Sequence, residues 1–359
     1  MSGIPGSLDS IPILGILFQF IGYALANLEF ISNTTVAVAV PITLAALCGV
    51  LCERSGVVNI GIEGIMLTAA FVGWFIAALA ANALGTGTPT PYFGLTLPLV
   101  IGLAAAIAAG MLVALLHAWL AVTLRIDQII SGTIINIGAA GFTGYMYSLI
   151  ASQSLVGAGS FSKLVVPPEV EGVPIVGWLL NAVVGQGPIG ITTLVIVVML
   201  QIMLFRSRWG LRTRASGEHP RAAETVGIDV VWLRYRNVVA SGALAALGGA
   251  WLSMEQTGGF NAGMTQGRGF IGLAAMIVGR WTPVGAFGAA LLFASVTGLS
   301  QSITISRPTG DLGNLMNPVP GEFWEALPYI ITIVVLAGLI GRSIAPAADG
   351  VPYERESAT

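Results

Sequence analysis

Charged residues are scarce in this sequence. They make up 9% of its 359 residues, whereas hydrophobic residues make up 55% and the mean hydropathy is +0.87. A soluble chain of this length needs far more polar side chains to cover its surface. The formal net charge of −2 also provides no basic surface for nucleic acid. The composition therefore predicts an all-α polytopic membrane protein that binds no nucleic acid.

Residues that catalyse reactions or bind metals are equally few. The single lysine, Lys163 in FSKLVV, does not belong to a phosphate-binding G-x-x-x-x-G-K-[ST] pattern, so the chain is not expected to hydrolyse ATP itself. The two cysteines, Cys48 and Cys52, lie four residues apart on an apolar helix face. His117 is predicted to be a satisfied helix-packing residue. With only one other histidine, the sequence supplies no nucleophile with its base and no metal cluster, which argues against an intramembrane enzyme and predicts no catalytic residue and no metal site.

One stretch reverses this scarcity of charge. Residues 206–236 hold seven of the fifteen Lys and Arg residues and lie between two apolar segments. The seven are Arg206, Arg208, Arg212, Arg214, Arg221, Arg234 and Arg236. Loops rich in Lys and Arg stay on the cytoplasmic side of a membrane. Residues 206–236 are therefore predicted to form a cytoplasmic loop, and this assignment fixes the direction of every other span.

Inside this loop, the segment GEHPRAAETVGI has the pattern of a short helix. Pro220 suits the start of a helix and Gly227 suits its stop. Ala222, Ala223 and Val226 share one face, which would present a small apolar knob with a charged rim to the cytosol. Such a knob suits a groove in a partner protein. A solvated helix that merely joins two spans has the same pattern, so the residues alone leave both interpretations open.

Ten apolar segments are candidates to cross a bilayer. They lie near residues 11–28, 35–52, 65–83, 95–123, 128–150, 188–205, 237–254, 268–279, 282–300 and 326–341. The eighth is too short to cross alone and is interpreted as a possible half-helix, whereas the fourth is long enough to tilt. Counting outward from the Arg-rich loop places both termini in the cytosol. The resulting organisation is a tail at residues 1–10, one transmembrane permease domain at 11–342 and a tail at 343–359.

The remaining basic residues test this topology. Five more of them fall on the cytoplasmic side: Arg54, Arg125, Arg280, Arg342 and Arg355. Three fall outside: Lys163, Arg268 and Arg307. The split of 12 to 3 among the 15 basic residues is the bias that a correct ten-span topology should give.

The pattern E-x-x-G-x-x-N-x-G occurs twice, at residues 53–61 and 255–263, and each copy follows a similar apolar helix end. In the predicted topology the first copy ends an outside-to-inside span and the second ends an inside-to-outside span. The ten spans then form a five-plus-five inverted repeat, which places a transport pathway on its pseudo-twofold axis. The glycines permit turns or broken helices at membrane depth. Asn59 and Asn261 are predicted to cap these turns locally rather than to touch a ligand.

Secondary transporters also contain inverted repeats. They normally need acidic or histidine relay residues inside their spans. This chain keeps nearly all of its carboxylates at span ends or in loops, which argues against that class without excluding it.

Residues 51–64, LCERSGVVNIGIEG, resemble the signature of bacterial ABC-importer permeases in the branched-chain amino acid and simple-sugar superfamily. The form ERSGVVNIG is similar to that of the nucleoside-transporting branch. The resemblance continues through residues 217–228, which are similar to the cytoplasmic coupling segment of the family, and then through residues 263–275, 278–283 and 325–329. It covers nearly the whole chain apart from the two ends.

The resemblance implies a subunit that forms the translocation path of an importer and works with three partners. These are a cytoplasmic ABC ATPase that binds ATP and Mg, an extracytoplasmic substrate-binding lipoprotein, and a second homologous permease. A heterodimer is expected, with a homodimer as the alternative. No cofactor is expected on this chain, and the expected location is the bacterial cytoplasmic membrane. The expected substrate is a nucleoside, with simple sugars or branched-chain amino acids as alternatives.

The resemblance also implies roles for individual residues. The expected ATPase-coupling residues are Gly217, Glu218, Pro220, Arg221, Ala222, Ala223, Glu224 and Gly227. A nucleoside is neutral, partly aromatic and rich in hydroxyls, so its path needs amides, hydroxyls and aromatic faces rather than a charged clamp. Candidate path residues at or near span ends are Asn59, Glu63, Gln128, Asn136, Asn261 and Gln266. Ordinary helix packing explains each of these six residues equally well.

Overall fold

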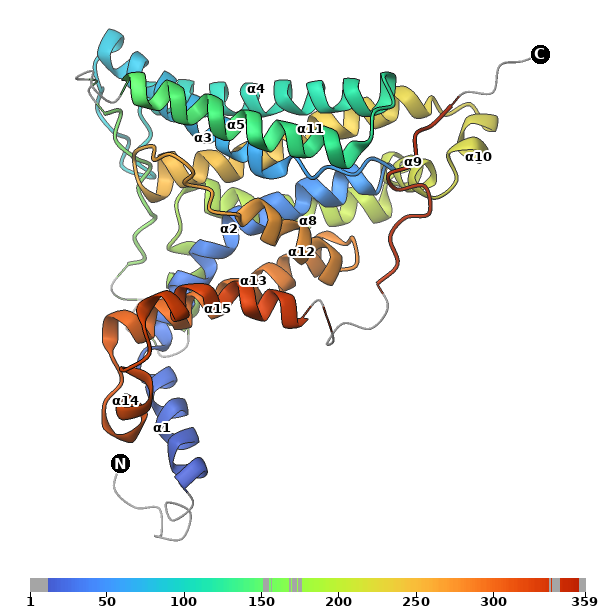
Figure 1. Cartoon of the computed structure of the whole chain (residues 1–359). Helices are drawn as coiled ribbons and strands as arrows, with labels where there is room; N and C mark the ends of the chain where they lie inside the picture. Colours follow the sequence, from blue (N-terminus) through green and yellow to red (C-terminus); the bar gives the residue numbers. More distant parts are fainter. Residues whose placement is uncertain are drawn as a thin grey trace.

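The computed structural model describes residues 12–150, 155, 157–167, 169, 173, 176–335, 337 and 343–354, and it forms no β-strand among them. The helices, in chain order, are α1 (Pro12–Ala26), α2 (Leu28–Glu53), α3 (Ile62–Leu84), α4 (Leu97–Ala118) with the π-helical turn η1 (Trp119–Thr123), α5 (Gln128–Ile150), α7 (Val176–Val184), α8 (Pro188–Arg206), α9 (Arg208–Glu218), α10 (Pro220–Thr225), α11 (Val230–Ala250) with the π-helical turn η2 (Trp251–Gln256), α12 (Arg268–Val278), α13 (Pro283–Ser306), α14 (Gly310–Met316) and α15 (Gly321–Val334). Figure 1 shows most of the long helices lying along one direction.

Among the described residues, seven helices are long and apolar enough to cross a membrane. They span Leu28–Glu53, Ile62–Leu84, Leu97–Thr123, Gln128–Ile150, Pro188–Arg206, Val230–Gln256 and Pro283–Ser306. The predicted all-helical membrane protein is therefore confirmed for the described residues. Each of the ten predicted spans overlaps a helix in its described residues, and residues 11, 336 and 338–341 of the first and tenth spans lie outside them. The described helices α1, α12 and α15 contain 15, 11 and 14 residues. The number of complete crossings thus stays a prediction.

α2 and α11 form the centre of the bundle. α2 packs on α11, α12 and α13, and α11 packs on α2, α3 and α4. Glycines permit these close approaches, because a Cβ added at Gly272 would lie 2.4 Å from the Ala45 Cβ, and one at Gly242 would lie 2.4 Å from the Ala114 Cβ. Every residue of α2 from Val38 to Glu53 is buried. This all-round burial explains why the sequence of α2 is a continuous apolar run without an amphipathic period.

The first two helices differ from the predicted hairpin of two spans. Only Asn27 separates α1 from α2, and the Ile31 N–H bonds back to the Asn27 carbonyl over 2.9 Å, so the chain has no loop in which to reverse direction. α1 instead packs beside α14, where the Gln19 side-chain oxygen accepts the Leu312 N–H at 2.9 Å. Figure 1 shows this pair extending away from the rest of the bundle. The structure therefore gives no support to the predicted inward-to-outward first span, and the side on which the N-terminus lies stays a prediction.

The Arg-rich segment is more ordered than the predicted loop with one short helix. α8 ends at Arg206, α9 and α10 follow, and α11 begins at Val230, seven residues before the predicted span. The Ser207 hydroxyl accepts the Gly210 N–H over 3.1 Å and caps α9, which makes the break from α8 a defined corner. The sequence prediction missed α9 because its six polar or charged residues give no apolar stripe.

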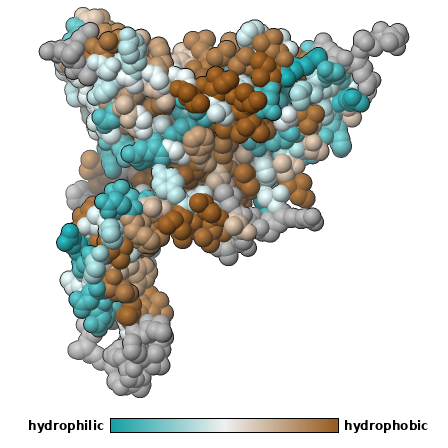
Figure 2. All heavy atoms as spheres, viewed as in Figure 1, coloured by the Kyte–Doolittle hydropathy of each residue, from teal (hydrophilic) through white to brown (hydrophobic). Residues whose placement is uncertain are grey.

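The described basic residues predicted on the cytoplasmic side gather at one end of the bundle, here called the basic end and formed by α9 and α10. The other two, Arg342 and Arg355, lie outside the described residues. Arg54 lies 4.0 Å from Glu218 at the end of α9, and its Nη2 donates to the Arg280 carbonyl over 3.2 Å. Arg125 lies 2.6 Å from Glu354, so the described C-terminal residues reach the same end. Figure 2 shows hydrophilic side chains around this end and hydrophobic ones over the neighbouring bundle.

Candidate coupling surface and substrate path

α10 projects from the bundle between two sharp turns. Pro220 occupies its first turn, as the sequence predicts, and the helix ends at Thr225, two residues before Gly227. Gly227 has φ +81°, a conformation that glycine adopts without strain, and it turns the chain toward α11. The Asp229 carboxylate then accepts the Trp232 N–H over 3.0 Å and caps α11. The short helix is thus held at both ends by residues of defined conformation.

The end of α9 rests directly on the loop that follows α2. A Cβ added at Gly217 would lie 2.4 Å from the Arg54 carbonyl oxygen, so the two backbones touch. The Ser216 hydroxyl donates to the Ser55 carbonyl over 3.1 Å. Burial lowers the pKa of Arg54, and the charge of Glu218 acts in the opposite direction. The end of α9 and residues 54–56 are therefore in direct contact.

The exposed face of α10 differs from the predicted knob. Arg221, Ala222, Thr225 and Val226 are exposed, with Val226 75% exposed. Ala223 is only 3% exposed, because it packs against Val230 and Tyr353 beneath the helix. The prediction that Ala223 shares the presented face is therefore wrong. The face available to a partner carries Ala222 and Val226, whereas Ala223 packs against Val230 and Tyr353 on the opposite face.

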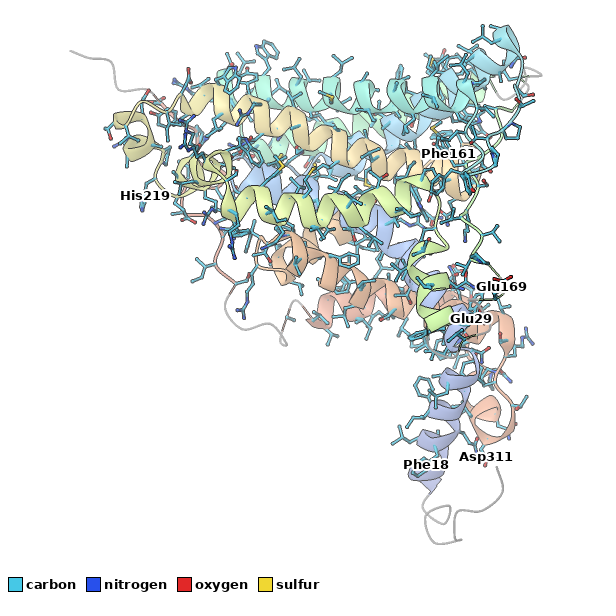
Figure 3. The ribbon with its side chains drawn as sticks, turned by 180° about the vertical axis from the view of Figure 1, so that it is seen from behind. Phe18, Glu29, Phe161, Glu169, His219 and Asp311 are labelled. Atoms are coloured by element: carbon cyan, nitrogen blue, oxygen red, sulfur yellow. The ribbon has the colours of Figure 1, made fainter. Side chains whose placement is uncertain are left out.

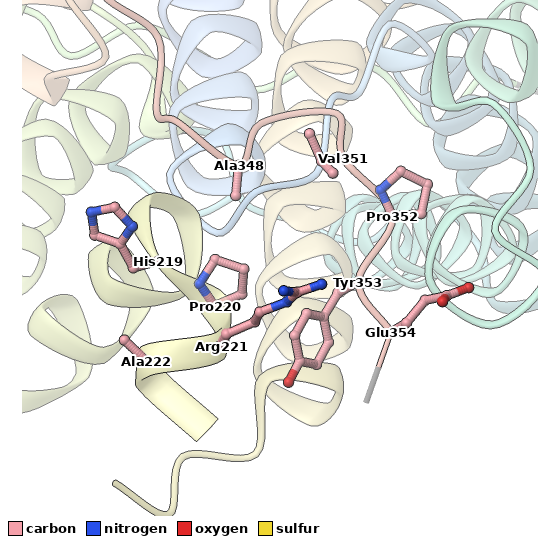
Figure 4. A pocket seen from close by; sticks show the side chains of 9 residues that line it. All are labelled: His219, Pro220, Arg221, Ala222, Ala348, Val351, Pro352, Tyr353 and Glu354. Carbon is pink, nitrogen blue, oxygen red and sulfur yellow. The ribbon is translucent and has the colours of Figure 1, made fainter. Parts of the chain in front are cut away.

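A cavity of about 590 Å³ lies between α10 and the C-terminal residues. His219, Pro220, Arg221 and Ala222 form one side of it, and the opposite side consists of Ala348, Val351, Pro352, Tyr353 and Glu354. Figure 4 shows the two sides facing each other at the basic end. Figure 3 places His219 at this end and Phe161 at the opposite end of the bundle. Described residues of the predicted C-terminal tail, 343–359, thus line one cavity together with α10.

Two candidate path residues hold the loop between α2 and α3, residues 54–61, in place. The Gln128 side-chain oxygen accepts the Val58 N–H over 2.6 Å. The Asn136 side chain accepts the Gly64 N–H over 2.7 Å and donates to the Ile60 carbonyl over 3.0 Å. In this structure the Gln128 oxygen and both groups of the Asn136 amide thus bond to backbone, which is the packing alternative that the sequence left open. Contact with a substrate is untested for either residue.

His117 also holds this loop in place. Its ring nitrogens lie 3.0 Å from the Ser131 hydroxyl and 2.9 Å from the Val58 carbonyl oxygen, and its side chain is fully buried. The prediction of a satisfied packing histidine is confirmed.

The two asparagines of the repeated pattern do not cap helices in the described structure. Asn59 is fully buried, its amide nitrogen lies 3.7 Å from the Cys52 sulfur, and its side-chain oxygen has no hydrogen-bond partner. The residue that precedes α3 is Gly61, without a side-chain cap. Asn261 is exposed. The capping prediction is therefore wrong for both, because side chains from neighbouring helices take that role.

Glu63 supplies one of these caps. Its two carboxylate oxygens accept the N–H groups of Gly267 and Gly269, each over 2.7 Å, at the start of α12. A carboxylate is favourable there because the first N–H groups of a helix lack partners and the dipole is positive. α12 has 11 residues and so rises about 16 Å, roughly half of a bilayer core. The predicted half-helix therefore has its start stabilised from α3.

A second cavity, of about 710 Å³, opens beside the start of α12. It lies among α2, α12, α13 and α15, and its polar lining consists of Gln266, Arg268, Thr297, Ser300, Gln301, Thr304, Glu325 and Tyr329. Gln266 has φ +48°, a strained value for a residue other than glycine, and its carbonyl accepts the Tyr329 hydroxyl over 2.8 Å. Among the six candidate path residues, only Gln266 lines this cavity.

The sequence analysis missed the other polar lining residues. Arg268 was assigned to the outer side, but its Nη1 donates to the Met264 carbonyl over 3.0 Å at the start of α12. Ser300 and Thr304 lie four residues apart in α13, so they share one helix face. That spacing is the signal that would have identified them.

The second copy of the repeated pattern lies away from the basic end. Glu255 accepts the N–H groups of Ile189 over 2.8 Å and Gly190 over 3.3 Å, at the start of α8. α11 and η2 together contain 27 residues, so about 40 Å of helix separates Glu255 from the start of α11. In the described part of the chain, no three His, Cys, Asp or Glu side chains come close enough to hold a metal ion.

Comparison with known proteins identifies a family. The family described as "Branched-chain amino acid transport system / permease component" matches residues 31–339. The guanosine ABC transporter permease protein NupQ of Bacillus subtilis is 38% identical over 332 residues, which cover 91% of this chain and 97% of the relative. The nucleoside ABC transporter permease protein NupC of Lactococcus lactis is 34% identical over 327 residues, with the same two shares covered.

A third relative has a different printed substrate. The putative glucose ABC transporter permease protein TsgC13 of Haloferax volcanii is 30% identical over 338 residues, which cover 90% of this chain and 97% of the relative. All three matches extend over nearly the full length of both chains.

Proposed function

This chain belongs to the branched-chain amino acid transport system permease family, and we propose that it forms the membrane path of an ABC importer for nucleosides. The observation that carries the proposal is the near full-length identity of 38% and 34% to two permeases whose names specify guanosine and nucleosides. The motif ERSGVVNIG at residues 53–61 supports the same branch. The chain itself is a transport subunit, an integral membrane protein of the bacterial cytoplasmic membrane.

The energy for transport is proposed to come from a separate ATPase subunit, which holds ATP and Mg. α10 is the element that fits this role, because it projects at the basic end and exposes Ala222 and Val226 between Arg221 and Thr225. A small apolar face with a polar rim can enter a groove and exclude water there. Closure of the ATPase would then move α10, and the contact of Gly217 with Arg54 places the loop after α2 next to the segment that moves.

The path through the membrane is proposed to follow an inverted repeat. In support, α2 packs on α12 and α13 just as α11 packs on α3 and α4, and the two copies of the repeated pattern lie at opposite ends of α11. The cavity beside the start of α12 would be one section of this path. Its hydroxyls and amides match the hydrogen-bonding groups of a ribose, and the Trp324 and Tyr329 rings offer faces for a base.

Two further partners complete the proposed importer. An extracytoplasmic binding lipoprotein would deliver the nucleoside at the end opposite α10, and a second, different permease would form the other half of the path. A homodimer is the alternative arrangement.

A sugar is the second candidate substrate, because the relative TsgC13 is named for glucose. The polar lining of the cavity suits the hydroxyls of a sugar as well. The two candidate substrates differ in whether they carry a nucleobase. Stimulation by a nucleoside but not by free ribose would therefore favour the nucleoside.

The test is co-purification of the chain with a candidate ATPase, second permease and binding protein, followed by ATP hydrolysis and uptake in lipid vesicles. We expect nucleoside-loaded binding protein to stimulate both. Val226→Asp should abolish ATPase association, because a charge would enter the groove, whereas Val226→Leu should preserve it. Stimulation by ribose or a branched-chain amino acid alone would overturn the substrate, and failure of every ATPase to associate would overturn the importer.

A further inference from the structure

The described C-terminal residues 346–354, here called the strap, bind both helices of the Arg-rich segment. The Ala348 N–H donates to the Gly217 carbonyl over 2.8 Å, at the end of α9. The Tyr353 hydroxyl donates to the Glu224 carboxylate on α10. Tyr353 is 8% exposed and packs with Ala223 on the underside of α10. The strap therefore holds α10 from the side that faces the bundle.

The strap also contacts the loop that follows α2. A Cβ added at Gly56 would lie 3.2 Å from the Ala348 carbonyl oxygen, and one at Gly350 would lie 3.3 Å from a methyl group of Val58. The Asp349 carboxyl is close enough to Glu53, the last residue of α2, for the charges of the two groups to interact. One short segment thus contacts the coupling helix and the first copy of the repeated pattern at once.

Arg234 joins these elements from within. It is 1% exposed, its Nε donates to the Ser55 carbonyl over 3.2 Å, and its Nη1 donates to the Val351 carbonyl over 3.0 Å. Its guanidinium carbon lies 5.8 Å from the centre of the Tyr353 ring. A planar guanidinium directs its donors at fixed angles, so it holds the loop and the strap in one relative position.

We propose that the strap, positioned by Arg234, is the mechanical link that transmits movement of α10 to the loop after α2. This proposal rests on the proposed function, since it requires an ATPase that moves α10. The strap lies beneath α10, whereas the face with Ala222 and Val226 remains open to the partner. Binding of the ATPase and transmission of its movement are therefore assigned to different residues, which makes them separable by mutation.

The geometry explains why the link is stiff. The three backbone carbonyls at Gly217, Ser55 and Val351 are all engaged in hydrogen bonds between segments that are far apart in sequence. Moving one segment alone would leave buried polar groups without partners, which is unfavourable. The three segments are therefore expected to move together.

The experiment compares four variant chains with the parent chain, each in the complete complex with ATPase, second permease and binding protein. The variants are a chain ending at Ile344, a matched chain ending at Glu354, Tyr353→Phe and Glu354→Gln. For each, ATPase association, ATP hydrolysis and nucleoside uptake are measured separately. We expect the chain ending at Ile344 to bind the ATPase and hydrolyse ATP normally. Uptake per ATP should fall about tenfold or more, which is the effect expected from losing one buried hydrogen bond to a charged group.

Tyr353→Phe keeps the ring and removes only the bond to Glu224, so it should reduce uptake per ATP without unfolding the strap. The chain ending at Glu354 should match the parent. Glu354→Gln, which removes only an exposed ion pair, should change uptake per ATP far less than Tyr353→Phe does. Hydrogen exchange of residues 54–61 provides the direct readout: trapping the ATPase with ATP should change it in the parent but not in the chain ending at Ile344.

Uptake per ATP equal to the parent in the chain ending at Ile344 would overturn the strap proposal. Loss of ATPase association in that chain, with Tyr353→Phe unchanged, would also overturn it, because the strap would then serve only folding. Failure of the proposed function is distinct, since it shows in the parent chain as the absence of any associated ATPase.

Discussion

The two copies of E-x-x-G-x-x-N-x-G are held very differently. In the first copy, Glu53, Ser55 and Asn59 are all buried, and the loop backbone bonds to α4, α5, α9 and α11. In the second copy, Asn261 is exposed, and a Cβ added at Gly259 or Gly263 would meet nothing within 4 Å. The same sequence pattern therefore lies in one crowded and one open environment.

The difference comes from segments that are not repeated. α9, α10 and the strap occur only at the basic end, and they cover the first copy. What the copies share is the acidic residue at the helix end: Glu53 accepts the Trp281 indole N–H over 2.5 Å, and Glu255 accepts two N–H groups of α8. The pattern thus specifies a helix end, whereas the surrounding segments decide whether that end transmits movement or stays open.

Matched glycines give the largest expected contrast. Gly56 has φ +89° and a Cβ there would lie 2.5 Å from the buried Arg234 guanidinium, whereas the matching Gly258 has φ +63° and its nearest neighbour would be 3.2 Å away. Gly56→Ala should therefore cost about 3 kcal/mol or more, from backbone strain plus overpacking. Gly258→Ala should cost about 1–2 kcal/mol, mainly from the left-handed backbone. Thermal unfolding in detergent compares the two, and equal losses would contradict the contrast.

Glu63 offers the next largest effect, because it connects the first copy to the start of α12. Glu63→Gln places an amide where two N–H groups need acceptors, so one N–H loses its partner at a cost of about 2 kcal/mol. We expect faster hydrogen exchange at Gly267 or Gly269 and lower thermal stability. Glu255→Gln is the matched control in the second copy, where exchange should instead rise at Ile189 or Gly190. Unchanged exchange at α12 in Glu63→Gln would show that the carboxylate does not hold the half-helix.

The strap should make the crowded copy sensitive to pH. Burial raises the pKa of Asp349 to about 6, although Glu53 and Arg234 beside it act in the opposite direction. Because the docked strap then binds a proton more tightly than the free strap, docking is strongest at low pH and weakens as pH rises toward and past 6. Protection of the Ala348 N–H, corrected for intrinsic exchange, should fall about tenfold between pH 5 and 7.5.

Asp349→Asn removes this carboxyl and should flatten the profile, whereas exchange at the Phe161 N–H, which bonds to the Met254 carbonyl near the second copy, should show no matching trend. Protection that rises with pH in the parent chain would contradict the predicted sign.

The long apolar helices were predictable, and the details at their ends were not. All-round apolar runs identify α2 and α4 directly, because a helix that is buried in a bundle, like α2, or that exposes an apolar face to lipid, like α4, needs no polar face. The kinked junction at Asn27 was missed because a hairpin and a bend have the same apolar composition. α9 was missed because its stability comes from contact with Arg54 and Ser55, which are distant in sequence.

The candidate site shows the same division. Pro220 and Gly227 marked the coupling helix because proline and glycine act on local backbone conformation. The burial of Ala223 could not be predicted, since it depends on Tyr353, more than a hundred positions later in the sequence. Glu63, Gln128 and Asn136 were selected as polar residues near span ends, but whether a polar group meets backbone or substrate depends on tertiary position.

The smallest effect is expected where the strap is exposed. Arg125 and Glu354 lie 2.6 Å apart, yet their side chains are 46% and 69% exposed. Exposed ion pairs contribute little because water solvates both charges, so Glu354→Gln should change the free energy of unfolding by less than about 0.5 kcal/mol. Asn261→Ala in the open copy should be equally mild. Thermal unfolding at low and high salt checks both. A loss near 2 kcal/mol for Glu354→Gln would mean that charge, rather than the buried contacts of Arg234 and Tyr353, holds the strap in place.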